Sequence, residues 1–223
     1  IAKSRELRMY AQLNLLSVVV YIFFSFLPVI TRIGYYFSVV QIFMIPMMII
    51  GLVFYIWSPE TLSKRLRSKE ERTKQKGVVA FSGLIFIASF ILAGLDYRFG
   101  WSDMPSWIIW CCTTLFLLSY GMYAEVMREN EWLSRSIEVA DDQKVVSSGL
   151  YGIVRHPMYS ATIGMFLSMP IVMESWWAFL AMIPYVPIIV YRIKDEEILL
   201  TEELEGYSEY KQKVKWRLIP FIW

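Results

Sequence analysis

The chain of 223 residues is 57% hydrophobic and carries a formal net charge of +2. Its apolar residues gather in runs long enough to cross a bilayer, which indicates an integral, multi-pass membrane protein in contact with lipid. The small net charge gives no reason to expect nucleic acid as a partner. The two cysteines, Cys111 and Cys112, are adjacent inside an apolar run, so we expect helix-packing roles and no metal site.

Four apolar segments in the first half predict membrane helices over residues 11–30, 35–57, 78–95 and 105–127. About twenty residues at a rise of 1.5 Å cover the roughly 30 Å hydrocarbon core. Pro46 is expected to kink the second helix. Residues 58–77 carry seven basic side chains, which is typical of a cytoplasmic loop that sets topology and also fits a patch for lipid phosphates.

The second half alternates polar and apolar segments. Helices are predicted over residues 157–173 and 176–194, as a hairpin. In residues 195–223 an apolar face recurs at helical spacing, formed by Leu199, Leu200, Leu204, Tyr207 and Tyr210. The predicted fold is all-α, a polytopic bundle of about six membrane helices followed by a cytoplasmic amphipathic helix at the C-terminus.

The distribution of basic residues predicts the orientation. With a cytoplasmic N-terminus and six helices, twenty basic residues lie on the cytoplasmic side, and only Arg32 and Arg98 lie on the other. The fifth helix is short, so its hairpin either crosses the bilayer or dips into it, and both geometries return the chain to the same side. Both termini and residues 128–156 are therefore expected at the cytoplasmic face.

A polar stretch over residues 148–159 holds the only histidine of the chain, His156, between Arg155 and Pro157. Pro157 lacks a backbone N–H and suits the first turn of a helix, whereas it favours an extended backbone at His156. The imidazole should thus lie where a loop becomes a helix, beside free amides. Such a histidine either hydrogen-bonds a backbone carbonyl or, as we hypothesise, forms one wall of a cofactor pocket.

A second polar pair, Arg192 and Glu196, is predicted near the cytoplasmic end of the sixth helix. The two residues are four apart, so their side chains share one helix face. They either form a helix-end ion pair or line a cavity, because charges at membrane depth are costly to bury elsewhere. Their expected position at the same membrane face as His156 favours the cavity.

An ordered set of motifs covers the region from Glu129 to the C-terminus: Gly149-Leu150-Tyr151, Arg155 to Tyr159, Arg192 with Glu196-Glu197, Gly206 to Lys211, and Arg217-Leu218-Ile219-Pro220. In this order and spacing they resemble the isoprenylcysteine carboxyl methyltransferase family, part of a wider group that includes phospholipid methyltransferases. Leu150 departs from the proline or valine common in that family, and nothing before Glu129 is diagnostic.

The resemblance implies an S-adenosylmethionine-dependent methyltransferase that releases S-adenosylhomocysteine and acts on a lipophilic or membrane-delivered acceptor, a carboxylate being one candidate. It divides the chain into an N-terminal region of four spans (1–127) and a methyltransferase core (128–223). Carried over by position, the cofactor contacts are Glu138, Gln143, Lys144, Val145, Val146, Tyr151, His156, Pro157, Met158, Tyr159 and Glu196. Arg192 and Glu196 are the implied catalytic residues, with Arg192 facing the acceptor carboxylate.

These residue types suit methyl transfer, in which the enzyme mainly positions two reactants and excludes water. Glu196 suits a cationic sulfonium, and Arg192 offers a planar fork to a carboxylate. Two alternatives remain from the sequence: an NADPH-dependent sterol or steroid-type reductase, which shares an arginine-histidine-proline region, and a non-catalytic transporter. Ser160-Ala161 stands where such reductases tend to have a glycine-glutamate pair. The sequence indicates neither the acceptor nor an oligomeric state.

Overall fold

The computed structural model describes residues 34–57, 73–130, 132 and 143–223, and within these ranges the regular secondary structure is entirely helical. The chain divides into two compact units, residues 1–66 and 67–223. In the first unit, α2 spans Gly34–Trp57 and continues through Pro46. The predicted helix over residues 11–30, most of the basic loop and Glu138 lie outside the described residues. The predicted boundary between residues 127 and 128 stays a prediction.

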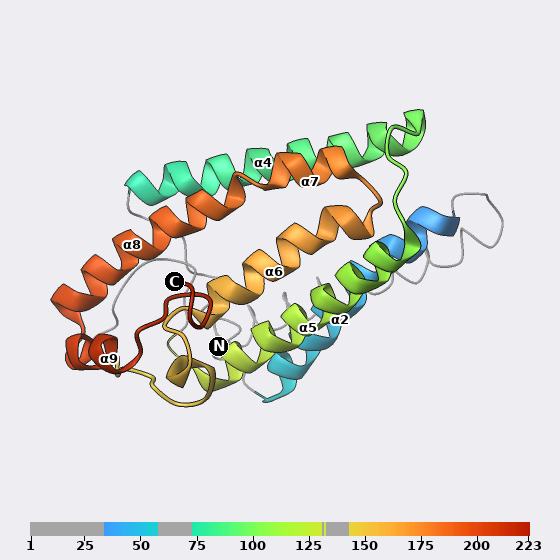
Figure 1. Ribbon diagram of the computed structural model, residues 1–223. Helices are drawn as coiled ribbons and strands as arrows, with labels where there is room; N and C mark the ends of the chain where they lie inside the picture. Colours follow the sequence, from blue (N-terminus) through green and yellow to red (C-terminus); the bar gives the residue numbers. More distant parts are fainter. Residues whose placement is uncertain (1–33, 58–72, 131, 133–142) are drawn as a thin grey trace, which may run out of the picture. The chain divides into compact units, whose positions relative to one another are not determined.

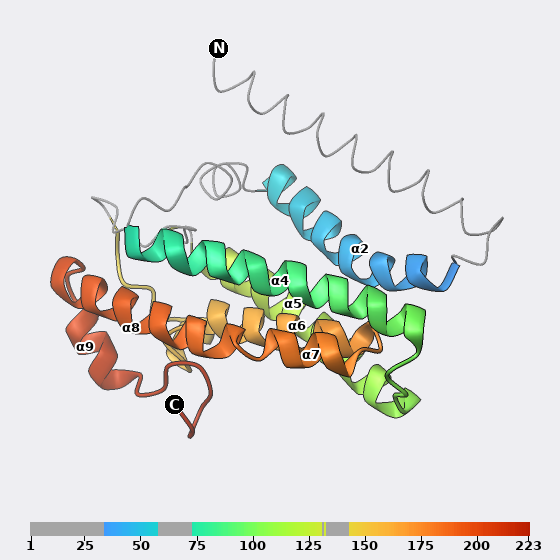
Figure 2. The ribbon, with the colours of Figure 1, turned by 90° about the horizontal axis from the view of Figure 1, so that it is seen from above.

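The described residues of the second unit form a series of helices and one 3₁₀ turn: α4 (Thr73–Phe99), α5 (Ser106–Glu129), η2 (Gly149–Gly152), α6 (Pro157–Val172), α7 (Trp176–Met182), α8 (Tyr185–Glu203) and α9 (Tyr207–Lys213). The most extensive packing joins α5 to α6, and α4 runs along α7 and α8 (Figures 1 and 2). α6 also packs against α7, so it lies between the two pairs.

Three stretches of this unit are long and apolar enough to cross a membrane: Gln75–Phe99, Ser106–Glu129 and Trp176–Glu203. With 16 residues, α6 is only about 24 Å long, less than the roughly 30 Å hydrocarbon core. The all-helical membrane fold expected from the sequence is confirmed. The number of spans and the side of the membrane on which the termini lie stay predictions.

The predicted sixth helix over residues 176–194 is divided in the structure. Pro184 separates α7 from α8, because its ring clashes with the carbonyl of residue 180 and it has no N–H to donate. α8 then continues to Glu203, nine residues past the predicted end, so the C-terminal segment is not one amphipathic helix. Gly206, with a φ of +82°, turns the chain into α9.

The end of the bundle farthest from η2 and α9 is tied together by Asp96, which is buried near the end of α4. Its carboxylate accepts hydrogen bonds from the backbone N–H of Ser102 at 2.7 Å and the Ser102 hydroxyl at 2.6 Å. The hydroxyl of Ser175, which caps α7 by accepting from the N–H of Ala178, donates to the same carboxylate. One buried acid thus fixes the loop after α4 and the start of α7.

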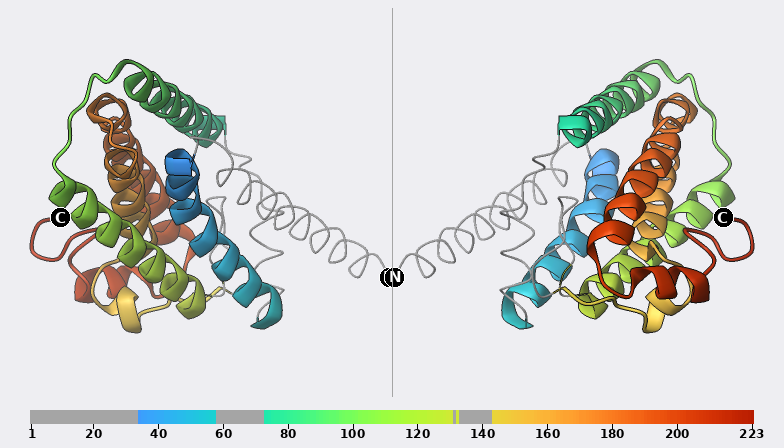
Figure 3. Two further views of the ribbon diagram at one scale, coloured as in Figure 1. Left: turned by 90° about the vertical axis from the view of Figure 1, so that its right-hand side faces the viewer. Right: turned by 90° about the vertical axis from the view of Figure 1, so that its left-hand side faces the viewer.

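The chain after α9 returns to the start of α6 (Figure 1). The backbone N–H of Arg155 donates to the carbonyl of Trp216 at 2.9 Å, and that of His156 to the carbonyl of Arg217 at 2.9 Å. η2 and α9 lie close together at the same end of the unit (Figure 3), where the Tyr210 hydroxyl donates to the carbonyl of Tyr151 at 2.7 Å. The last ten residues therefore hold the loop that carries the histidine.

Candidate functional site

A buried carboxylate, Glu197, organises the polar groups at the start of α6. Its Oε1 accepts from Nε of Arg155 at 2.7 Å and lies 3.3 Å from Nε2 of His156. Its Oε2 accepts from Nε of Arg217 at 2.9 Å. The side chains of Glu197 and Arg155 are each only 4% exposed. Because a buried ion pair needs further hydrogen bonds to offset desolvation, the second arginine and the histidine complete the pairing.

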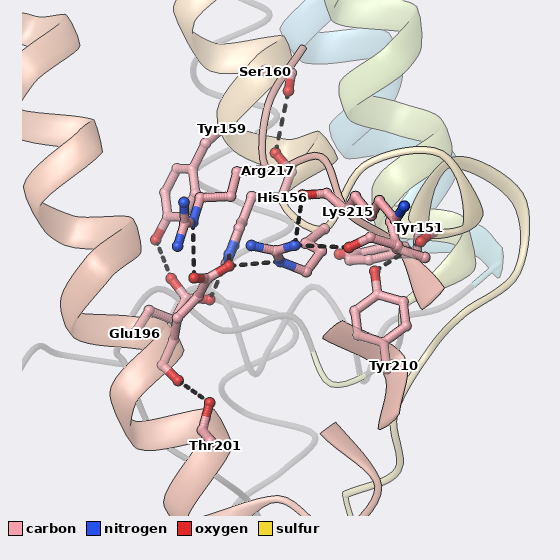
Figure 4. A network of polar contacts seen from close by, with 12 residues as sticks. Tyr151, His156, Tyr159, Ser160, Glu196, Thr201, Tyr210, Lys215 and Arg217 are labelled. Atoms are coloured by element: carbon pink, nitrogen blue, oxygen red, sulfur yellow. Dashed lines mark hydrogen bonds and ion pairs between the residues drawn. The ribbon is translucent and has the colours of Figure 1, made fainter. Parts of the chain in front are cut away.

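Arg155 is fully engaged on its other side. Its Nη1 donates to the carbonyls of Val214 at 2.7 Å and Lys215 at 2.9 Å. These are the residues that follow α9, so one guanidinium joins the loop before α6, helix α8 and the C-terminal segment (Figure 4). A planar fork with five donors can make all of these contacts at once. Arg155 therefore acts as a structural clamp in the wall of the site.

The sequence motifs indicated Glu196 as the functional acid, whereas no separate role was predicted for Glu197. The missed signal is the spacing of the buried face of α8, which consists of Tyr185, Ile189, Ile193 and Glu197 at intervals of four. A carboxylate on a buried helical face requires buried partners. The partners themselves, at residues 155, 156 and 217, are too far away in sequence for this pattern to identify.

A pocket opens beside this clamp, and its lining comes from the second unit. Of the predicted site residues, it is lined by residues 143–146, Tyr151, His156, Met158, Tyr159, Arg192 and Glu196. Pro157 does not line it but forms the first position of α6, as the sequence indicated, with His156 as the capping residue. The lining also contains eight residues that were not predicted as site residues: Asn130, Trp132, Arg155, Leu199, Leu200, Leu204, Tyr207 and Tyr210.

Arg192 and Glu196 do not pair directly in the manner of a simple helix-end salt bridge, because the hydroxyl of Tyr159 lies between them. Nε of Arg192 donates to this hydroxyl at 2.9 Å. The hydroxyl donates to Oε2 of Glu196 at 2.6 Å, as Figure 4 shows. Nδ1 of His156 lies 4.0 Å from Oε1 of Glu196. Tyr159 of α6 therefore bridges the guanidinium of Arg192 and the carboxylate of Glu196, both on α8.

Two tyrosines of α9 differ sharply in their hydrogen bonding. Tyr210 donates to the carbonyl of Tyr151, whose own hydroxyl accepts from Nδ2 of Asn130 at 2.9 Å. The hydroxyl of Tyr207 is buried and has no hydrogen-bond partner within the described part of the chain. Burial raises the pKa of Tyr207 well above its usual range, and the charges of Glu197 and Glu196 raise it further. A neutral, unused donor therefore lies in the pocket wall.

The turn that carries Tyr151 requires a glycine. Gly149 has a φ of +49°, and a Cβ placed on it would overlap the carboxylate of Glu129. The other oxygen of Glu129 accepts from the backbone N–H of Leu150 at 2.9 Å, which fixes η2 to the end of α5. Only a residue without a side chain permits this close approach at this backbone conformation.

Two comparisons with known proteins bear on this arrangement. The family model described as phospholipid methyltransferase (PEMT) matches residues 107–205. The fold is similar to that of a solved structure, the eukaryotic intramembrane Ras methyltransferase ICMT (isoprenylcysteine carboxyl methyltransferase), with a TM-score of 0.60, 18% sequence identity, and coverage of 85% of this chain and 67% of that chain. A comparison with curated protein sequences finds no match.

The fold and the matched region support a membrane methyltransferase, and the reductase and transporter alternatives are not favoured. Residues 107–205 are similar to the phospholipid methyltransferases, and the fold is similar to that of ICMT. The resemblance noted from the sequence motifs is thereby confirmed. The match covers α5 to α8 and includes every residue of the pocket lining except Tyr207 and Tyr210.

Proposed function

We propose that the protein transfers a methyl group from S-adenosylmethionine to a carboxylate on a lipophilic acceptor. The observation that carries this proposal is the pair of opposite charges that Tyr159 separates in one pocket, Arg192 and Glu196. A sulfonium donor is cationic and a carboxylate acceptor is anionic, so each has an oppositely charged side chain to bind. S-adenosylmethionine, when bound, supplies an activated methyl group on a sulfonium.

The residues of the pocket fit this cofactor. Its lining includes five apolar side chains, Val145, Val146, Leu199, Leu200 and Leu204, which suit a flat heterocycle. The buried Tyr207 hydroxyl needs a hydrogen-bond acceptor, because an unpaired buried donor costs free energy. Ring nitrogens, ribose hydroxyls and a carboxylate of the cofactor all offer acceptors.

In this proposal Glu196 holds the cationic sulfonium end, and Tyr159 fixes the orientation of its carboxylate. Arg192 binds the acceptor carboxylate and holds it in line with the carbon–sulfur bond that breaks. As the new oxygen–carbon bond forms, both reactants lose their charge, giving a neutral ester and a neutral thioether. The apolar wall excludes water, which favours a reaction that removes charge. No general acid is needed.

The proposal is tested first by calorimetric binding of S-adenosylhomocysteine to the full chain in detergent. Glu196→Gln and His156→Ala should weaken binding, whereas Lys194→Ala, which removes an exposed charge of α8 outside the pocket lining, should not. Wild-type affinity in both Glu196→Gln and His156→Ala would contradict the cofactor site.

The acceptor is tested by transfer of labelled methyl groups to S-farnesyl-N-acetylcysteine, to its carboxamide, and to phosphatidylethanolamine. The proposal predicts labelling of the free carboxylate only, and a large loss in Arg192→Ala but not in Lys194→Ala. Labelling of the amine lipid with none on the carboxylate would contradict the acceptor class while leaving the methyl donor intact.

The two tyrosines of α9 give a matched pair of variants for the cofactor wall. Tyr207→Phe removes a hydroxyl that is unpaired in the described structure, so stability should stay unchanged while S-adenosylhomocysteine affinity falls by about 2- to 10-fold. Tyr210→Phe removes the bond to Tyr151 and should cost about 1 kcal/mol of stability. Unchanged affinity in Tyr207→Phe would exclude its hydroxyl as a ligand contact.

A further inference from the structure

A glutamine at the start of α4 reaches the arginine of the pocket from a separate helix. Gln75 has no exposed surface, although it falls within the polar stretch that the sequence assigned to a loop. Its Nε2 donates to Oδ2 of Asp195 at 2.6 Å. Its Oε1 lies 3.5 Å from Nη1 of Arg192, which donates to it. The amide thus links two neighbouring charged residues of α8.

The chemistry of the contacts determines which way the amide faces. A carboxylate without a proton only accepts hydrogen bonds, and a guanidinium only donates them. The NH₂ group of Gln75 must therefore face Asp195, and its carbonyl oxygen must face Arg192. Of the uncharged side chains of this length, only glutamine offers a donor and an acceptor together, whereas leucine or methionine offers neither.

Arg192 is consequently held from two directions. Tyr159 of α6 accepts from its Nε at 2.9 Å, and Gln75 of α4 accepts from its Nη1. Arginine has several rotatable bonds, and contacts from two helices fix both the position and the plane of its guanidinium. The orientation of a planar fork determines whether it meets a carboxylate with two parallel hydrogen bonds.

We propose that Gln75 is a positioning residue for the acceptor site, which orients Arg192 toward the carboxylate of the methyl acceptor while Asp195 fixes the amide. This inference rests on the proposed function, because it assigns the target of Arg192 to the acceptor. Gln75 does not line the pocket, and its contact with a lining residue is the one to Arg192, so its effect on the acceptor is expected to pass through Arg192.

A purely structural role for Gln75 makes different predictions. A buried amide that only joins α4 to α8 would, when removed, lower stability and reduce every activity in parallel. Ser89 provides the matched control, because it is equally buried on α4 and its hydroxyl donates to the carbonyl of Ala178 on α7 at 3.1 Å, away from the pocket. A loss specific to Gln75 and to the acceptor separates positioning from packing.

The test measures methyl transfer to S-farnesyl-N-acetylcysteine by the full chain, together with calorimetric binding of S-adenosylhomocysteine. Gln75→Leu should lower kcat/KM for this acceptor about tenfold, mainly through KM, with the affinity for S-adenosylhomocysteine within about twofold of wild type. Ser89→Ala should leave both quantities near wild type. An equal loss of acceptor and product binding in Gln75→Leu would overturn the proposal.

Two double variants sharpen the test. In an Arg192→Ala background, Gln75→Leu should have no further effect on kcat/KM, because the residue on which it acts is gone. The double variant Gln75→Glu with Asp195→Asn exchanges the positions of the amide and the carboxylate and keeps a hydrogen-bond acceptor beside Arg192. Its KM should return most of the way from the Gln75→Leu value to the wild-type value. Additive losses of kcat/KM in the Arg192→Ala, Gln75→Leu variant would contradict the positioning role. So would a KM in the Gln75→Glu, Asp195→Asn variant that stays as high as in Gln75→Leu.

The result also separates this inference from the function on which it rests. If the wild type methylates the probe and Gln75→Leu does so with an unchanged kcat/KM, only the positioning role is contradicted. If the wild type neither binds S-adenosylhomocysteine nor methylates the probe, the proposed function fails and the inference fails with it.

Discussion

Replacement of Glu197 by glutamine tests whether the two adjacent glutamates of α8 have separate tasks. Glu197 is buried and bonded to Arg155, His156 and Arg217. Glu196 is 24% exposed at its side chain and accepts one hydrogen bond, from Tyr159. We expect Glu197→Gln to lower stability strongly and Glu196→Gln to lower mainly the affinity for the ligand.

The magnitude follows from the burial of the ion pair. Removal of one partner of a buried pair costs about 3–5 kcal/mol, because the remaining charge is left without compensation. Glutamine keeps one oxygen, and Arg155 keeps its bonds to the carbonyls of Val214 and Lys215, so the cost should lie near the lower value. In a protein of this size, about 3 kcal/mol corresponds to a decrease in Tm of about 6–12 °C.

The assay is thermal unfolding of the detergent-solubilised chain with and without S-adenosylhomocysteine, followed by calorimetry at a temperature where each variant is folded. Glu196→Gln should unfold within about 1–2 °C of wild type and gain little from the ligand. Equal Tm values for the two variants would refute the division between a structural and a ligand-binding glutamate. So would a Glu197→Gln variant that is as stable as wild type.

Three further predictions concern other parts of the second unit. Gly149→Ala should cost at least about 1–3 kcal/mol in a thermal melt, from its φ of +49° and the clash at its Cβ, whereas Gly121→Ala, with open space around its Cβ, should be neutral or stabilising. Asp96→Ala should lower Tm without changing S-adenosylhomocysteine affinity, because its hydroxyl partners lie at the far end of the bundle. Burial raises the pKa of Tyr207 and Tyr210, so both keep their protons in the folded protein at a pH where the unfolded chain loses them. Stability should therefore fall as the pH rises above about 10. Replacement of both tyrosines by phenylalanine should make the decrease of Tm with pH less steep.

The sequence predicted the features that depend on neighbouring residues. The start of α6 at Pro157 follows from the missing N–H of proline, and the long apolar runs follow from the thickness of the bilayer. The residues carried over from the family motifs line one pocket, with two exceptions. Pro157 begins α6 and is not part of the lining, and Glu138 lies outside the described residues. Their roles stay predictions until ligand binding is measured.

Features that depend on distant contacts were not predicted. Gln75 was assigned to a loop because it stands among basic residues, yet its partners Arg192 and Asp195 lie 117 and 120 residues away. The charged residues after 194 suggested a new surface helix, although α8 continues through them because its buried face keeps its spacing to Glu197. A polar residue can satisfy a buried position when its partners come from other elements, and a local pattern does not contain those partners.

The geometry of α8 joins the structural and functional groups into one system. Successive residues of a helix point about 100° apart, so Glu196 and Glu197 face different surroundings although they are neighbours. Residues four apart share a face, which places Arg192 with Glu196 toward the pocket and Ile193 with Glu197 toward the core. The clamp of Glu197 on Arg155 fixes the rotation of α8 about its axis. The pocket pair on the other face is held separately through Tyr159 of α6, so loss of the clamp should lower stability more than ligand affinity.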